Sequence, residues 1–95
     1  MIKLISIIIL KLFFYGGLEV KLNDLNIGDR AVVKKIDTSE SLKQRLLSFG
    51  VGRGAKISVE KYSIGKKTFE ILVDGTLIAL RDEEAKKIEV EKIDE

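Results

Sequence analysis

The chain has 95 residues, of which 45% are hydrophobic, and it contains no cysteine and no histidine. This length and apolar content predict one domain with one core. Charged residues make up 34% of the chain, but the net charge is only +2, which is typical of a solvated surface rather than a clustered basic face for nucleic acid. Without cysteine there are no disulfides or thiolate metal sites, and without histidine the commonest transition-metal ligand is missing.

Sequence motifs for catalysis are also missing. The chain has no Gly-Xaa-Ser-Xaa-Gly nucleophile elbow, no phosphate-binding glycine loop and no dinucleotide fingerprint. We therefore expect a protein that is not an enzyme, has no cofactor and binds no small-molecule substrate.

Residues 1–18 differ in composition from the rest of the chain. Their apolar run is shorter than the roughly 20 residues of a spanning helix and is interrupted by Lys11. A secretory signal would need a small-residue cleavage site, which the run lacks. Three interpretations stay open: an interfacial membrane anchor, an added strand or helix packed on the domain, or translated upstream sequence. In the third, codons for Gly16-Gly17 form a ribosome-binding sequence and the native start lies near Val20.

Residues 19–95 are expected to form the domain. Its first part reads as a lead-in, in which Leu22, Leu25 and Ile27 alternate with turn-forming residues and a turn closes at Gly28. Residues 30–36 have the length and the β-branched content of a strand.

A short helix is predicted next. Ser39 is a natural N-cap, and Leu42, Leu46 and Phe49 have the i, i+4, i+7 spacing of one apolar stripe. Gly50 ends the helix, because glycine enters the left-handed conformation without a Cβ clash.

The segment that follows contains Gly52 and Gly54, and together with Gly50 these residues predict a tight path from the helix into a strand at 55–61. Further on, strands at 67–73 and 76–80 are joined by Asp-Gly, a favoured dipeptide for a type I′ hairpin turn. The last expected elements are a single helical turn at 82–85 and a strand at 87–90.

These elements predict a mainly β fold with five short strands. One short helix lies between the first and second strands, and a single helical turn precedes the last strand. We expect a small barrel, because closing the sheet removes the edges that short strands otherwise leave exposed.

Three groups of residues resemble the FeoA family. They are Leu22, Leu25 and Gly28 in the spacing L-xx-L-xx-G; Arg45 to Val51 as R-L-xx-F-G-V, with Gly54 after it; and Ile78 to Arg81, Ala85, Ile88 and Val90. The resemblance covers residues 22–90. It implies an SH3-like barrel and a cytoplasmic accessory protein of bacterial ferrous-iron uptake. Such a protein works at the inner face of the cell membrane with FeoB, a GTP-hydrolysing iron(II) permease.

The resemblance has one departure and one alternative. Arg53 stands where many family members carry proline, so a looser turn is expected. The same barrel occurs at the C-terminus of iron-dependent repressors, which makes a metal- or ligand-sensing regulatory domain the alternative. No DNA-binding helix pair is expected before the domain, which argues against a repressor. The sequence has no basic stripe with interleaved aromatics, so no nucleic-acid partner is expected. Membrane contact by this chain is expected only through residues 1–18.

The candidate partner-binding residues surround the helix end and the glycine turn. They are Arg45, Leu47, Phe49, Gly50, Val51, Gly52, Arg53 and Gly54. Leu47 lies about 140° around the helix from Leu42, so it either widens the face packed on the barrel or is exposed to a partner. The two arginines are either solvated charges or partner contacts. The glycines serve turn geometry, or they let a partner backbone come close.

The carboxylates at the predicted helical turn, Asp82, Glu83 and Glu84, are oxygen ligands of the kind that iron(II) or magnesium accepts. Consecutive residues on a helix point about 100° apart, so these side chains are not expected to converge on one ion. We predict no metal ligand among them and interpret them as solvated carboxylates at a helix start.

Overall fold

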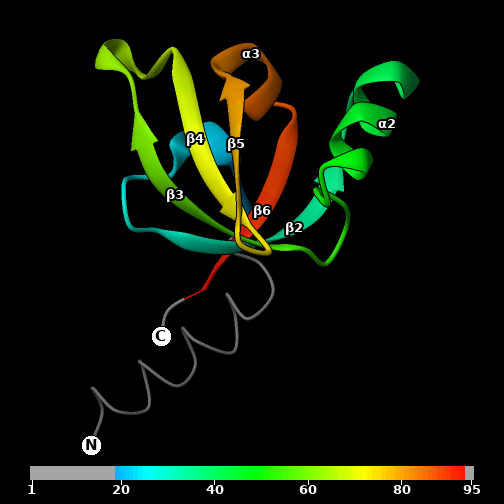
Figure 1. The fold of residues 1–95 in the computed structure, drawn as a ribbon, viewed down its shortest axis with the longest axis horizontal. Coiled ribbons are helices and arrows are strands. Elements are labelled where there is room, and N and C mark those ends of the chain that lie inside the picture. Colours follow the sequence, from blue (N-terminus) through cyan, green and yellow to red (C-terminus); the bar gives the residue numbers. More distant parts are fainter. Residues whose placement is uncertain (1–18, 94–95) are drawn as a thin grey trace, which may run out of the picture.

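The computed structural model of the protein describes residues 19–93, which form one antiparallel sheet of six strands in the order β1-β6-β2-β3-β4-β5 (Figure 1). The strands are β1 (Glu19–Lys21), β2 (Arg30–Ile36), β3 (Lys56–Tyr62), β4 (Thr68–Val73), β5 (Thr76–Arg81) and β6 (Ile88–Ile93). The helices are α2 (Glu40–Ser48), α3 (Asp82–Ala85) and the 3-10 turns η1 (Leu22–Asp24) and η2 (Ile64–Lys66). The interpretations of residues 1–18 lie outside the described residues.

The mainly β fold, with one helix after the first long strand and a helical turn before the last strand, is confirmed, but the sheet has six strands instead of five. The additional strand is β1, within the expected lead-in, and it pairs with β6 so that Val20 lies opposite Val90. Three residues are too few to show a strand period in sequence. Among residues 19–93 no ladder joins the end strands β1 and β5, so the sheet curls without closing by hydrogen bonds.

The core lies inside the curve of the sheet. Phe69 of β4 is its largest fully buried side chain. Leu22 and Leu25, which carry the first family spacing, are also fully buried and hold the lead-in on the core. Burial of a leucine side chain stabilises a fold by roughly 1.5–3 kcal/mol, so this pair explains why a segment with little regular structure keeps one path.

The β4–β5 hairpin has the predicted turn. Asp74 and Gly75 both have positive φ, 48° and 79°, as a type I′ turn requires. The strands leave the turn with Val73 opposite Thr76.

Helix α2 lies beside the sheet and is joined to it by few buried side chains (Figure 1). Leu46 is its only buried residue, and Leu42 is partly buried. Phe49 was expected on the same apolar stripe, but it is 47% exposed. It occupies the C-cap with φ −90° and ψ 0°, where the chain leaves the helix and the 100° step no longer applies. No helix within residues 19–93 has the length and apolar composition that a membrane span requires.

Candidate functional site

Helix α2 begins and ends where the sequence predicted. The Leu42 N–H donates to Ser39 Oγ at 3.5 Å, which is the expected N-cap. Gly50 has φ +88°, and its N–H donates to Leu47 O at 3.0 Å. The Val51 N–H donates to Leu46 O at 2.8 Å, which completes a Schellman motif at the helix end.

Val51 belongs to the core and not to the surface. It and Leu46 are both fully buried, which is the hydrophobic contact that accompanies a Schellman motif. Of the candidate partner-binding residues, Val51 therefore positions the others, while its own side chain is covered.

Leu47 is 53% exposed, so it is not covered by the sheet. Its side chain lies over Gly52, since a Cβ built on Gly52 would come within 2.8 Å of Leu47 Cδ2. Gly52 lacks a positive φ, so the absence of its side chain makes room for Leu47 in this position and is not needed for the backbone conformation. Together these residues place a half-exposed apolar side chain flat against the turn.

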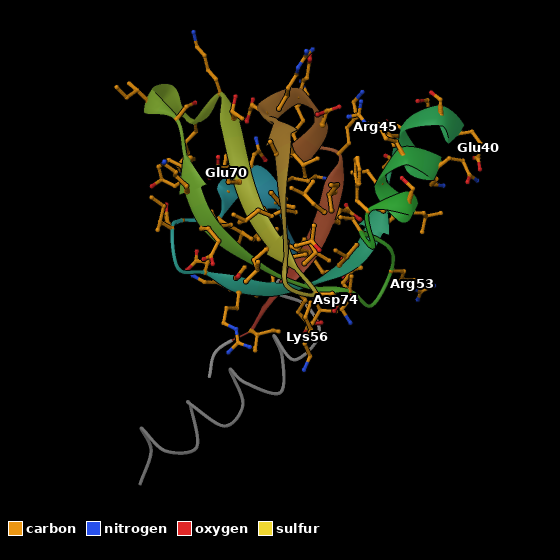
Figure 2. The ribbon with its side chains drawn as sticks, in the orientation of Figure 1. Glu40, Arg45, Arg53, Lys56, Glu70 and Asp74 are labelled. Carbon is orange, nitrogen blue, oxygen red and sulfur yellow. The ribbon has the colours of Figure 1, made fainter. Side chains whose placement is uncertain are left out.

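Arg45 points from α2 toward α3, where its guanidinium forms an ion pair with Glu84 (Figure 2). The arginine side chain stays 53% exposed, while that of Glu84 is 16% exposed. The same carboxylate accepts the Arg81 N–H at 3.0 Å. Arg45 therefore connects the helix to the rest of the domain and keeps part of its surface available.

Arg53 lies in the turn between α2 and β3 and extends away from the sheet (Figure 2). The Ala55 N–H donates to Gly52 O at 3.0 Å, which closes a four-residue turn with Arg53 and Gly54 at its centre. Gly54 has φ +90°, as the third residue of a type II turn requires, and its N–H donates to Val33 O at 2.8 Å.

The C-terminal end of α2 also adjoins the β4–β5 hairpin. A Cβ on Gly50 would lie 3.7 Å from Val73 Cγ1 and 3.9 Å from Asp74 Oδ2. We call the members of the predicted set that are not buried the α2-turn surface; they are Arg45, Leu47, Phe49, Gly50, Gly52, Arg53 and Gly54.

Three lysines that no sequence pattern indicated lie beside this surface. Lys34, Lys35 and Lys43 line one groove with Leu47 and Arg53. Lys34 and Lys35 are adjacent, but Lys43 and Arg53 lie in other segments of the chain, so the sequence shows no repeated basic pattern.

The carboxylates of α3 face different neighbours. Asp82 accepts a hydrogen bond from Asn23 at 3.0 Å, Glu83 lies 3.7 Å from Arg81, and Glu84 pairs with Arg45. Within residues 19–93, no three acidic, histidine or cysteine side chains come together as a metal-ligand cluster.

The FeoA domain model matches residues 20–92. The chain belongs to the FeoA family. It is 35% identical over 72 residues to the "Putative Fe(2+) transport protein A" of Campylobacter jejuni, and the match covers 76% of this chain and 97% of that protein. The solution structure of FeoA from Chlorobium tepidum is 34% identical with a TM-score of 0.71, and the match covers 75% of this chain and 68% of that one.

The FeoA fold also occurs in larger proteins. A manganese-dependent transcriptional repressor superimposes with a TM-score of 0.72 at 17% identity, and the match covers 79% of this chain but 41% of the repressor. At that identity the likeness shows the fold alone.

Proposed function

We propose that this FeoA-family chain is a cytoplasmic accessory protein of ferrous-iron uptake. It docks on the FeoB GTPase permease at the inner face of the membrane and modulates permease assembly or the GTPase cycle, without catalysing a reaction itself. Similarity to the Campylobacter jejuni protein named for Fe(2+) transport supports the link to iron uptake. The observation that carries the docking proposal is the half-exposed Leu47 on the α2-turn surface.

Leu47 has the properties of an interface contact. It is apolar, half-exposed and supported from below by Gly52, so burying it under a partner requires no rearrangement of the fold. Placing an unpaired carboxylate at a buried interface contact costs about 2 kcal/mol or more of binding free energy, which corresponds to about 30-fold in affinity. Arg45, which is half exposed and pairs with Glu84, lies on the same helix.

The test measures binding of the full chain to the cytoplasmic GTPase domain of the permease from the same organism. Leu47→Asp should weaken binding about 30-fold. Ile64→Asp is the matched control, because Ile64 in η2, the connection between β3 and β4, is fully exposed and also changes from an aliphatic side chain to a carboxylate. Both variants should keep the circular dichroism spectrum of the parent. Equal affinity of the two variants, or no binding by the parent chain, would contradict the proposal.

A metal- or ligand-sensing regulatory domain is the second candidate. The observation in its favour is the shared fold with the manganese-dependent repressor. Titration of the full chain with iron(II) separates the candidates. Stoichiometric binding at micromolar affinity would favour the sensor, while its absence together with permease binding would favour the docking module.

A further inference from the structure

A groove of about 300 Å³ lies between α2, the end of β2 and the turn that precedes β3. Its basic side chains are Lys34, Lys35, Lys43 and Arg53, and its apolar part includes Leu47 beside Gly52. The four cations come from three different segments of the fold, so only folding brings them together. We call this feature the basic groove.

A β-bulge in β2 explains why two consecutive lysines line the same groove. In a regular strand, neighbouring side chains point to opposite faces of the sheet. The ladder between β2 and β6 shifts register between Val33 and Lys35, where Val33 is opposite Val90 and Lys35 is opposite Glu89. The extra residue, Lys34, interrupts the alternation, and such a bulge re-aims side chains.

The positive charge in the groove is only partly neutralised by the domain itself. Lys34 pairs with Glu91 at 3.0 Å. Lys35, Lys43 and Arg53 form no ion pair with any residue from 19 to 93.

Beyond the lysines of β2 the surface becomes mixed in charge. Glu19 and Glu89 line the neighbouring hollow, and Glu89 pairs with Lys21 at 2.9 Å. The uncompensated positive field is therefore strongest on the α2 side, where Lys43 and Leu47 lie one helical turn apart on the same face of the helix.

We propose that the basic groove binds an acidic protein segment whose apolar side chain rests against Leu47. Charge complementarity with the three cations that form no ion pair within residues 19–93 selects the acidic residues, and the Leu47–Gly52 contact gives the apolar side chain a surface to pack against. The inference rests on the proposed function for the identity of the partner, and it defines the chemistry of the segment that docks.

Two other occupants fit the groove less well. Residues 1–18 of this chain contain two lysines and no acidic residue, so their charge is of the wrong sign. Nucleic acid would match the charge, but no aromatic side chain lines the groove for base stacking.

The first experiment uses a fluorescein-labelled peptide of glutamates and aspartates around a single central leucine. Binding to the full chain is followed by fluorescence anisotropy, and the contacted residues are mapped by amide chemical shifts. At low salt we expect the shifts to centre on Lys35, Leu47 and Arg53. Lys35→Glu and Arg53→Glu should each weaken binding about tenfold, whereas the control Lys61→Glu, an exposed lysine on β3, should not.

Three results would overturn the proposal. They are no binding at low salt, equal binding of a peptide with serine in place of leucine, and tighter binding of an oligouridylate to the same residues. The serine peptide has the same charge but no apolar side chain, so it distinguishes packing against Leu47 from diffuse charge attraction. Salt screens diffuse attraction over about 8 Å at physiological ionic strength.

A competition experiment separates this inference from the proposed function. If the peptide displaces the permease GTPase domain, both stand. If the peptide occupies the groove without displacing that domain, the groove is confirmed as an acidic-segment site and the permease is not its partner. If the domain binds with equal affinity to Lys35→Glu, Arg53→Glu and parent chain, the proposed function stands and the groove is excluded as its docking site.

Discussion

Arg45 of α2 and Glu84 of α3 form an ion pair between residues 39 positions apart in the chain. The pair matters because α2 has a single buried side chain, Leu46, to hold it against the domain. Glu84 is the more enclosed partner, and its second oxygen accepts the Arg81 N–H at the start of α3. One carboxylate thus caps the helical turn and contacts the helix that carries the α2-turn surface.

Loss of this ion pair should lower stability modestly. Because Arg45 is about half exposed, we expect Arg45→Ala to reduce the free energy of unfolding by about 0.2–1 kcal/mol, as measured by urea denaturation. The control is Arg53→Ala, which removes an arginine that pairs with no other residue in 19–93 and should leave stability unchanged within about 0.5 kcal/mol. Equal loss in both variants would show that the pair does not hold α2.

The same carboxylate should make stability depend on pH. Partial burial raises the pKa of Glu84, but the Arg81 N–H and the Arg45 guanidinium outweigh burial and lower this pKa below its usual 4.5. A lowered pKa in the folded state means that ionised Glu84 stabilises the fold above pH 4.5, and that this stability is lost as pH falls through the folded-state value. We expect the urea midpoint of the parent to decrease in this acidic range, and less steeply in Glu84→Gln.

Two other carboxylates contribute to the parent's acid response. A hydrogen bond from the Asn26 N–H lowers the pKa of Asp29, and a hydrogen bond from Lys21 lowers that of Glu89. The difference between parent and Glu84→Gln isolates Glu84, and parallel curves for the two proteins would contradict the prediction.

Gly50 should be intolerant of a side chain for a backbone reason. Its φ of +88° lies in the left-handed region, so Gly50→Ala should cost about 1–2 kcal/mol of unfolding free energy. Urea denaturation measures the cost. A stability equal to that of the parent would mean that the Schellman motif is not needed to end α2.

Gly52→Ala should instead change the surface more than the stability. The new Cβ would meet Leu47 Cδ2 at 2.8 Å, and the flexible leucine end can move away, so we expect a stability change within about 0.5 kcal/mol. Displacement of Leu47 should weaken permease binding. In a Leu47→Ala background Gly52→Ala should have no further effect on affinity, and additive losses would refute the coupling of the two residues.

Arg53→Pro should stabilise the turn. Arg53 is the second residue of the turn closed between Gly52 and Ala55, a position that favours proline, and its N–H donates to no acceptor in residues 19–93. We expect a gain of about 0.4–1 kcal/mol from the stiffer unfolded chain, measured by thermal denaturation. Arg53→Ala removes the same charge without the ring and should show no gain. A destabilised proline variant would indicate a backbone incompatible with this turn.

Short-range signals determined the limits of several elements from the sequence alone. Ser39 and Gly50 bound α2 because capping depends on residues within one helical turn. Asp74 and Gly75 predicted the hairpin because a type I′ turn needs two adjacent positive φ values. The family spacing could be recognised in the sequence for a related reason. Packing restricts the residue type at Leu22 and Leu25, and backbone geometry restricts it at Gly50.

Only the tertiary structure decided which residues share a surface. β1 exists because a distant strand, β6, pairs with it, and the bulge at Lys34 exists because the β2–β6 register shifts there. Helical spacing likewise assigned Phe49 to the core, although the chain leaves the helix at that residue. These features depend on contacts between segments far apart in the chain, and local propensity carries no information about such contacts. The basic groove is therefore a property of the fold, although each of its lysines is visible in the sequence.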